Sequence, residues 1–517
     1  MILSSLVLCC CLVFVEARGL HFLKLPYGTW QAASFDEVAK AYTFKNVRYG
    51  APPVRNRRFA KPEPPEAVNG IQDGSKGAAY YSKIIQASLS KKVYSEDCLF
   101  LDLYVPEESL KSDNKLPVMV FVHGGGYTTG SKDMLDVVGL YDGTGLVKQS
   151  KGRAIVVTLN YRQLGVFGWL GGTTAELAGA TNLGLMDQRL AFEWVQKYIH
   201  LVGGDRNNVT AFGESAGGGS LMHHLTLGGG TISPLFNRVQ IYSAGLAYNF
   251  DRKGKLEDAF HKFSAIAGCQ GKGFSCLRAA SPQKLLLGQI AVAGLSFNIA
   301  KPQFGPVPDG NLVKNAASLD LAAGEFSFAM QYDAGLFVDQ TIKTDAGFLK
   351  LLLDAFGYVD IVASIAAEYP TQDYSSPLAR QQEVFKDAVF ACNYRWVTNA
   401  FPMSSYNMQF SGGSSGSHGQ VLPGVFYNPT LTVEANGTNF PVADYFGNQD
   451  IFNSLQSYIV SHAISGSPNT YRNAPSTIPW PKVSGATSEN LGNVLNVTNN
   501  GFQLIADRQG SSSRCDF

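Results

Sequence analysis

The sequence has almost no net charge and nothing that divides it into separate parts. Its 42 Lys and Arg residues balance 41 Asp and Glu residues, which leaves +1 over 517 residues. This balance argues against a nucleic-acid partner. There is no charge run, proline-rich linker or internal repeat. We therefore predict a single α/β domain over residues 18–517, enlarged by inserted loops and helices, with a looser helical segment between residues 250 and 420.

Long hydrophobic runs are also absent, apart from one at the amino terminus. The run from Ile2 to Val15 is too short to span a membrane, and the residues around Ala17 suit signal-peptide cleavage. No Lys or Arg precedes this run, which is a departure from the usual signal peptide. The carboxyl end, SSSRCDF, has no hydrophobic tail for a lipid anchor. We expect residues 1–17 to be a signal peptide and the mature chain to be secreted and extracellular, without a stable membrane anchor; the oligomeric state stays open.

Few cysteines remain once the predicted signal peptide is removed. Three of the eight lie within it, so the mature chain keeps five, an odd number. Cys269 and Cys276 are near enough in sequence to close a small disulfide loop in an oxidising compartment. The pairing of Cys98, Cys392 and Cys515 stays open. No group of Cys and His has the spacing of metal ligands, so we expect neither a metal nor a cofactor.

Three Asn-X-Ser/Thr sequons fit the prediction of secretion. They predict N-glycosylation at Asn208, Asn436 and Asn496. Asn208 adjoins an apolar strand, and burial of that strand would hinder its modification.

Two serines lie between glycines at the GxSxG spacing, Ser215 in GESAG and Ser414 in GGSSG. A nucleophile elbow needs a buried strand before the serine and a helix after it, because the sharp turn between them exposes the hydroxyl. The apolar NVTAFG precedes Ser215, and AGGGSLMHHLTL, with an apolar helical face, follows it. Ser414 lies in a polar loop without such a strand. The context predicts Ser215 as the nucleophile, with the small residues 216–219 letting the helix approach the strand.

A second glycine-rich turn is suited to stabilise an oxyanion. In VMVFVHGGGY, residues 118–127, an apolar strand ends in His123 and three glycines. Glycine permits the backbone angles that aim successive amides into one cavity, where they need no reorganisation during the reaction. The predicted donors are the amides of Gly125, Gly126 and Ala216, the residue after the nucleophile. His123 is expected to brace this loop.

A serine nucleophile needs a histidine to accept its proton and a carboxylate to orient that histidine. His418 lies in GSHGQ, a glycine-rich loop late in the chain where a mobile backbone can present a ring to a cleft. The GGSSG stretch around Ser414 then serves as the flexible approach to this base. His223 and His224 follow Ser215 on the predicted helix and point away from it, so they are assigned surface or packing roles.

The carboxylate is expected between the serine and the histidine in the chain, because GxSxG hydrolases order their triads in this way. In FSFAMQYDAGLFV, residues 326–338, an apolar strand ends at Asp333. Glu325, Asp339 and Asp345 are nearby, and spacing alone does not exclude them.

These motifs make the sequence similar to the type B carboxylesterase and lipase family of α/β hydrolases, which also contains the cholinesterases. The resemblance covers nearly the whole mature chain and is greatest to secreted fungal carboxylesterases, through GESAGGGSLMHH, SPLFNRV and the RCDF ending. It implies an α/β-hydrolase fold, with a central, mostly parallel sheet, helices on both faces and large helical and loop insertions. The other matching segments are FKNVRYGAPP (44–53), SEDCLFLDLYVP (95–106), VHGGGYTTGS (122–131), VVTLNYRQLGVFGWLGG (156–172) and NLGLMDQRLAFEWVQKYIHLVGGDRNNVTAFGESAGG (182–218).

The resemblance selects one of the candidate acids. The family's acid is a glutamate in an EGxxF setting, and DAGLF (333–337) matches this setting without a gap, so Asp333 takes the role. Its side chain is one methylene shorter than glutamate, and the backbone must lie closer to the base. The family's GxxHGxE becomes GSHGQ, which keeps His418 and replaces the second acid with Gln420.

Two departures from the family bear on the substrate. The usual disulfide partner of Cys98 is missing, because residues 19–97 contain no cysteine. Residues 80–94 contain neither a Trp nor an acidic cluster that would attract a quaternary ammonium group. The resemblance therefore does not extend to choline-ester specificity.

The sequence as a whole predicts a serine carboxylic-ester hydrolase that works through an acyl-enzyme on small-molecule or lipid esters. Ser215, His418 and Asp333 form the predicted triad, and Glu214 beside the nucleophile supports it from outside or serves the structure alone. One alternative is an interfacial triacylglycerol lipase, for which Ile84 and Ile85 are a weak sign. The alternative of another class is a non-catalytic binding or adhesion protein on the same fold, since a fold does not fix a function.

Overall fold

The computed structural model describes most of the chain. The predicted signal peptide, Asp333, Ser414 and Asn436 lie outside the described residues. Those residues are 19–76, 95–133, 140–163, 165–246, 249, 251–293, 304–315, 317, 329–331, 341–401, 404–412, 418–430, 432–435, 438–441, 448–472, 474, 476–483, 492–506 and 514.

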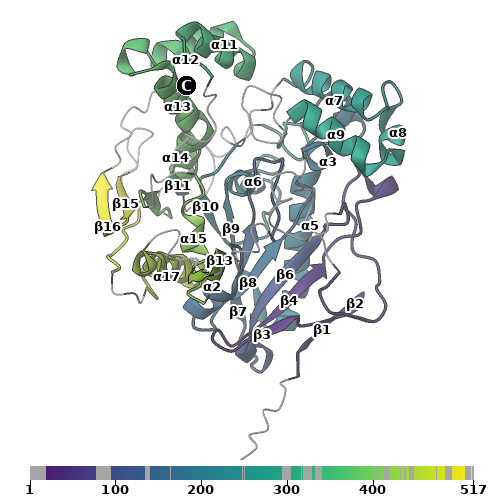
Figure 1. Cartoon of the computed structure of the whole chain (residues 1–517). Helices are drawn as coiled ribbons and strands as arrows, with labels where there is room; N and C mark the ends of the chain where they lie inside the picture. Colours follow the sequence, from purple (N-terminus) through teal and green to yellow (C-terminus); the bar gives the residue numbers. More distant parts are fainter. Residues whose placement is uncertain are drawn as a thin grey trace, which may run out of the picture.

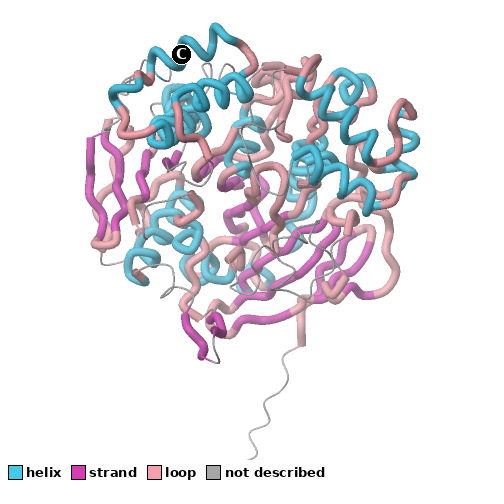
Figure 2. Tube along the Cα trace, turned by 45° about the horizontal axis from the view of Figure 1, so that its top comes forward, coloured by secondary structure: helices cyan, strands magenta, loops and turns pink. Residues whose placement is uncertain are grey.

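An eleven-stranded sheet runs through the described part of the chain, in the order β16-β15-β12-β11-β10-β9-β7-β8-β6-β4-β3. From β15 to β8 in this order each strand pairs with the next in parallel. The strands at the two edges pair antiparallel. In Figure 2 the strands form a twisted series with helices on either side. The predicted α/β-hydrolase fold class is confirmed.

The strands of this sheet are β3 (Ser34–Asp36), β4 (Ala41–Arg48), β6 (Phe100–Pro106), β7 (Leu116–Val122), β8 (Ile155–Leu159), β9 (Gly204–Glu214), β10 (Arg238–Tyr242), β11 (Ala329–Gln331), β12 (Asn407–Phe410), β15 (Asn493–Thr498) and β16 (Gly501–Ala506). Two smaller sheets consist of β1 (Phe22–Leu25), β2 (Gly28–Gln31) and β5 (Ile71–Gln72), and of β13 (Thr432–Ala435) and β14 (Thr438–Pro441).

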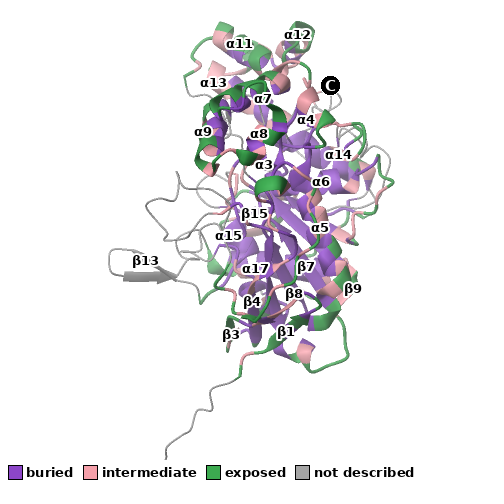
Figure 3. Ribbon diagram, turned by 90° about the vertical axis from the view of Figure 1, so that its right-hand side faces the viewer, coloured by how far each residue is buried: buried purple, intermediate pink, exposed green. Residues whose placement is uncertain are grey.

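The central strands are buried on both faces, as Figure 3 shows by colour. Along β7, Val118, Val120 and Val122 belong to one hydrophobic core, and Met119 and Phe121 to the other. Successive side chains of a strand point to opposite faces, so a continuous apolar run is what a sheet between two layers requires. The first core is shared with α5 (Leu183–Tyr198) and α6 (Ala216–Leu225), the second with α2 (Thr144–Gln149), α15 (Leu422–Val425) and α17 (Gln449–Ser465).

The predicted helices between residues 250 and 420 are present and fall into two groups. The first, α7 (Lys255–Ile266), α8 (Gly273–Ala279) and α9 (Pro282–Ala293), shares the first core of the sheet. The second, α11 (Asp345–Phe356), α12 (Val359–Glu368) and α13 (Pro377–Phe385), lies at one end of the molecule in Figure 1 and packs into small clusters of its own. A π-helix, η6 (Lys386–Ala391), joins α13 to α14 (Cys392–Ala400).

The remaining short helices connect these elements. They are α3 (Gly165–Gly168), α4 (Thr173–Leu177), η1 (Arg55–Arg57), η2 (Glu107–Leu110), η4 (Ile199–Val202) and η5 (Thr371–Asp373). Within the described residues, no helix combines the length and the apolar character needed to cross a membrane.

The disulfide predicted from the sequence is present. Cys269 and Cys276 form a disulfide, with their Cα atoms 5.6 Å apart. Cys392 is also disulfide-bonded, and its sulfur lies 3.9 Å from the carbonyl oxygen of Arg514. Cys98 is a buried free thiol.

Two of the predicted glycosylation sites, Asn208 and Asn496, lie among the described residues. Asn496 is buried on β15, where its side-chain oxygen accepts a hydrogen bond of 2.8 Å from Ser411 Oγ. A glycan is attached through Nδ2, and this side chain is buried in the folded chain, which argues against modification there. Asn208 is half-buried, and its side-chain oxygen accepts a hydrogen bond from Arg238.

Candidate active site

Ser215 stands at a sharp turn between β9 and α6, as the GESAG motif predicted. Its backbone angles are φ 56° and ψ −125°. A non-glycine residue in such a conformation costs about 1–3 kcal/mol, and strain of this kind is concentrated at functional sites. The turn is fixed from both sides, because the Ser215 amide donates to the Tyr242 carbonyl and the Ser215 carbonyl accepts from the Gly245 amide, each at 2.9 Å.

The glycines around Ser215 allow the helix to lie directly against the strands. A Cβ atom at Gly217 would stand 2.1 Å from the carbonyl oxygen of Val122 at the end of β7. A Cβ atom at Gly219 would stand 2.1 Å from the carbonyl oxygen of Gly245. Both distances are far below van der Waals contact, so the small residues expected after Ser215 are required by the packing.

The loop that follows β7 faces the nucleophile. A Cβ atom at Gly124 would lie 2.8 Å from Ser215 Cβ and 2.9 Å from Glu214 Oε2. Gly125 and Gly126 have φ values of 121° and 59°, which glycine adopts without strain. Among the described residues, the N–H groups of these two glycines donate no hydrogen bond, and the N–H of Ala216, at the start of α6, has no partner within the helix. Three donors are thus left available beside Ser215.

His123 braces this loop from behind, as the sequence predicted. Its Nδ1 lies 2.9 Å from the carbonyl oxygen of Gly124, and its ring stacks on Tyr161 with a centroid distance of 4.5 Å. The Tyr161 hydroxyl donates to the His123 carbonyl at 2.7 Å. Burial lowers the pKa of His123 to about 4, so the ring is neutral at physiological pH.

His418 lies beside the same turn, next to the residue that precedes Ser215. Its Nε2 lies 3.2 Å from Oε1 of Glu214, the residue before the nucleophile, and both side chains are buried. Its ring packs against Phe390 of η6, with centroids 4.7 Å apart. The backbone at Gly419 turns at a φ of 83°, beside the same carboxyl group. The predicted nucleophile, base and supporting glutamate therefore lie together, although more than two hundred residues separate Ser215 from His418 in the chain.

Burial sets the charge of this pair. It raises the pKa of Glu214 to about 8 and lowers the pKa of His418 to about 4. Removal from water disfavours the charged form of both groups, since neither a carboxylate nor an imidazolium is solvated there. Near neutral pH the contact is one between a carboxylic acid and a neutral imidazole. A neutral His418 is able to accept a proton.

Other histidines are excluded as the base by their positions. The surface role considered for His223 and His224 is wrong, because both are buried on α6, and the packing role is the one they fill. His224 Nε2 lies 3.0 Å from Gln188 Oε1. Burial holds the pKa of His224 at about 3 and that of His223 at about 4.

Phe390 and Tyr127 contribute to the site without having been predicted from the sequence. The Tyr127 hydroxyl donates to the Gly245 carbonyl at 3.1 Å, which ties the glycine loop to the segment behind Ser215. The position of Tyr127 directly after the three glycines could have indicated that it belongs to the site. Phe390 had no such signal, since nothing in the sequence indicated that a π-helix would direct this ring toward His418.

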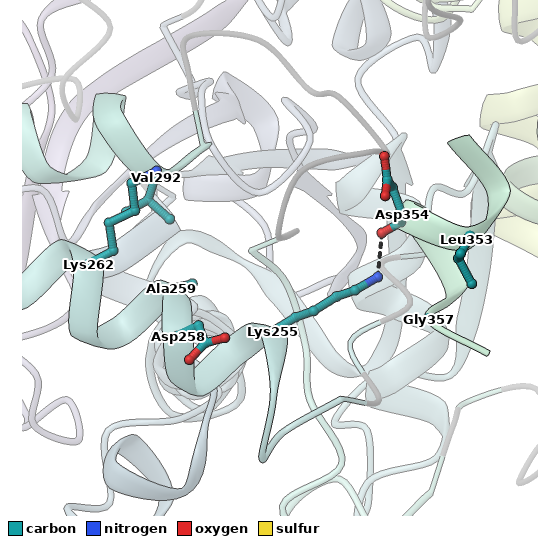
Figure 4. A pocket seen from close by; sticks show the side chains of 8 residues that line it. All are labelled: Lys255, Asp258, Ala259, Lys262, Val292, Leu353, Asp354 and Gly357. Atoms are coloured by element: carbon teal, nitrogen blue, oxygen red, sulfur yellow. Dashed lines mark hydrogen bonds between the residues drawn. The ribbon is translucent and has the colours of Figure 1, made fainter. Parts of the chain in front are cut away.

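A separate pocket lies among the inserted helices (Figure 4). Its volume is about 450 Å³, and Lys255 crosses it to donate to the carbonyl oxygens of Asp354 and Ala355 at the end of α11. Neither Ser215 nor His418 lines it; the lining residues are Lys255, Asp258, Ala259, Lys262, Val292, Leu353, Asp354 and Gly357. In the described part of the chain no group of three or more His, Cys, Asp or Glu residues could hold a metal ion.

The chain is similar to known carboxylesterases and lipases over nearly its whole length. The model of the carboxylesterase family matches residues 27–517. The chain is 40% identical to a secreted lipase of Arthroderma benhamiae, over 98% of this chain and 93% of that protein. It is 30% identical to carboxylesterase patB of Aspergillus clavatus, over 87% and 89% of the two chains. Among solved structures, Aspergillus niger EstA has a similar fold, with a TM-score of 0.82 at 24% identity, over 96% and 97% of the two chains.

Proposed function

Because the chain belongs to the carboxylesterase family, we propose that it is a secreted serine hydrolase that cleaves carboxylic esters through an acyl-enzyme intermediate. The observation that carries the proposal is the strained turn at Ser215, which lies against the glycines after β7, while His418 contacts Glu214, the residue before this serine. Acyl transfer needs these parts in this arrangement: a nucleophile, a base and donors for the oxyanion.

In the proposed mechanism, Ser215 Oγ attacks the ester carbonyl while Nε2 of His418, released from its contact with Glu214, accepts the serine proton. The amides of Gly125, Gly126 and Ala216 stabilise the oxyanion of the tetrahedral intermediate. His418 returns the proton to the departing alcohol, and a water molecule then cleaves the acyl-enzyme by the same steps. We assign Asp333 to hold the tautomer of His418, on the match of DAGLF to the family's motif.

Glu214 is assigned a supporting role in this mechanism. Its contact with His418 and its burial place a protonated carboxyl group beside the base. A neutral partner holds Nε2 of the imidazole in the resting enzyme and gives it up to Ser215 during the reaction, without adding a second negative charge to the one that Asp333 supplies. Two carboxylates around one imidazole would otherwise hold the proton on His418 and slow its return to the leaving group.

A second candidate, an interfacial lipase, is favoured by one observation. The relative with 40% identity over almost the whole chain is named a secreted lipase, whereas the relative with 30% identity is named a carboxylesterase. The two activities share one mechanism and differ in the physical state of the substrate. The non-catalytic alternative is disfavoured, because proteins that use the fold only for binding need neither the elbow serine nor the oxyanion glycines.

Secretion is part of the proposal. The disulfide between Cys269 and Cys276 is suited to an oxidising compartment. A relative with the word secreted in its name supports the same conclusion. Amino-terminal sequencing of protein from the culture medium tests it, and we expect the mature chain to begin at residue 18; retention of the whole protein in the cells would contradict secretion.

Hydrolysis of p-nitrophenyl esters of graded acyl length tests the activity. We expect turnover by the wild-type protein and none by Ser215→Ala, with Ser414→Ala as the control that keeps the second GxSxG serine under test. Highest turnover on short soluble esters would support the carboxylesterase, and a rise in rate on emulsified long-chain esters would support the lipase. A folded wild-type protein with no turnover on either kind of ester would contradict the proposal.

A further inference from the structure

Two lysines and two aspartates form a buried charge cluster beside the oxyanion loop, which we define as residues 124–131. Lys132 Nζ lies 2.9 and 3.0 Å from the two carboxylate oxygens of Asp102, and 2.8 Å from Oδ2 of Asp133. Lys45 Nζ approaches Asp102 at 2.9 Å. The side chains of Lys132 and Asp102 have no exposed surface, whereas that of Lys45 is 32% exposed.

A buried salt bridge of this kind is poorly explained by stability alone. The cost of removing two charges from water offsets most of their attraction, and well-packed apolar side chains often serve stability as well or better. What such a pair does provide is a fixed position, because breaking it leaves a buried charge without a partner. The question is therefore what Lys132 holds in place.

Lys132 is the first residue after the oxyanion loop, and the loop transmits its position. The Lys132 amide donates to Asn160 Oδ1 at 2.7 Å, so both its backbone and its side chain are anchored to the sheet. Two residues earlier, Gly130 folds back onto the start of the loop, where a Cβ atom would stand 2.3 Å from the Gly124 carbonyl oxygen. The Thr129 amide also donates to the Gly125 carbonyl at 2.9 Å. Because the two ends of the loop are in such close contact, a displacement of Lys132 would also displace Gly124 and Gly125.

We propose that Lys132 is a positioning residue for ester hydrolysis, which holds the exit of the oxyanion loop through its salt bridge to Asp102 and so aligns the amides of Gly125 and Gly126 with Ser215. This inference rests on the proposed function. Oxyanion donors act only when they are placed before the reaction at the position where charge develops. An anchor of the loop therefore affects the transition state more than the bound ester, although it touches neither.

The same carboxylate offers a matched control. Lys45 also neutralises Asp102, but it lies at an irregularity of β4, and the neighbouring Asn46 side chain donates to the Gly74 carbonyl at 2.7 Å. Lys45 also approaches Asp133 Oδ1 at 4.0 Å, but its own backbone belongs to β4 and not to the oxyanion loop. Lys45→Met and Lys132→Met each remove one cation from the same aspartate, and only the second change loosens the loop.

The experiment compares these two variants with the wild type, with active sites counted by an organophosphonate so that misfolded protein does not contribute. The readouts are kcat, KM and the inhibition constant of a trifluoromethyl ketone, which forms an oxyanion on the serine. We expect Lys132→Met to lower kcat by about 10- to 100-fold, which is less than the loss of a whole oxyanion donor causes. The inhibition constant of the ketone should rise by the same factor, and KM should change less than about threefold. Lys45→Met should change each constant by less than about threefold.

Values for Lys132→Met within about twofold of the wild type, per titrated site, would overturn the inference. If Lys132→Met does not fold, Asp102→Asn gives the same test with the shape of the side chain preserved, and we expect kcat and ketone affinity to fall together in it as well. If folded Asp102→Asn has the same kcat and the same affinity for the ketone as the wild type, the inference is likewise overturned. A wild-type protein without esterase activity would instead contradict the proposed function, which separates the two failures.

Discussion

Ser215 and His418 reach one site from two regions of different construction. Ser215 belongs to the sheet, where backbone hydrogen bonds to β10, to Gly245 and to α6 fix it, and where glycines of α6 lie too close to the neighbouring backbone for any side chain. His418 belongs to a loop, and Phe390, which packs on it, comes from a small cluster under α11 and α13, outside the two cores of the sheet. Backbone hydrogen bonds and close glycine contacts position Ser215, whereas His418 is positioned by side chains from distant segments.

Although they lie in regions of different construction, Ser215 and His418 should be equally necessary for ester hydrolysis. We expect His418→Ala to lower kcat on the order of 10⁶-fold, as Ser215→Ala should, because the members of a triad act as one unit. His261→Ala, which removes an exposed histidine of α7, is the control and should leave kcat unchanged. Single-turnover measurement of ester hydrolysis checks both. Retention of more than about one per cent of kcat in folded His418→Ala would show that another group is the base.

The acid is the member of the triad that the sequence supports by a motif alone. We expect Asp333→Asn to lower kcat about 10⁴-fold, because the histidine would then take the wrong tautomer. Matched Asp339→Asn, Glu325→Gln and Asp345→Asn changes should each leave kcat within about threefold. The measurement is kcat per titrated active site for the four variants. A loss confined to one of the other three would transfer the role to that residue.

Glycine substitutions should destabilise the region around Ser215 more than the loop that carries His418. Gly217→Ala forces a Cβ atom against the Val122 carbonyl in the rigid region, and we expect a loss of about 3 kcal/mol of unfolding free energy, or no folded protein. At Gly419, in the loop region, an added Cβ atom would make only an ordinary contact of 3.9 Å with Glu214 Oε1, so the positive φ is the main obstacle and we expect Gly419→Ala to cost about 1 kcal/mol. Urea denaturation measures both. Equal losses would remove the difference between the regions.

The pH dependence gives the smallest effect and reports on the loop region. His418 is active when neutral, and burial lowers its pKa to about 4, so kcat/KM should fall only as pH drops toward this value. The free energy of unfolding should also fall as pH falls. The unfolded chain binds a proton on this histidine near pH 6.5 and the folded chain does not, so His418 favours unfolding as pH falls from 6.5 to 4. A pH profile of kcat/KM between 3.5 and 9 checks this. An acid limb centred at pH 6.5 or above would contradict the buried environment of His418.

Glu214 should shape the alkaline side of the same profile. Its pKa of about 8 predicts that kcat/KM changes as the carboxyl group ionises beside His418. We expect Glu214→Gln to abolish this alkaline change while leaving the acid limb in place. If the alkaline limb persists in the variant, it belongs to another group.

The difference between the two regions also explains what could be predicted from the sequence. The strand before Ser215, the helix after it and the glycines at 124–126 were predictable, because short-range patterns encode a backbone that has few alternatives. The fold class followed from the same motifs. The contact between His418 and Glu214, the ring of Phe390 and the anchor at Lys132 were not, since each joins residues far apart in sequence through side-chain packing. The burial of Asn496 and of His223 was missed for the same reason.

Labelling with an organophosphonate, followed by mass spectrometry of the digested protein, tests the central claim most directly. The reagent reacts only with a serine that has an activated hydroxyl and an oxyanion site beside it. We predict one adduct per chain, on the peptide that contains Ser215. An adduct on the peptide of Ser414, or no adduct on folded protein, would contradict the assignment of Ser215 as the nucleophile of this enzyme.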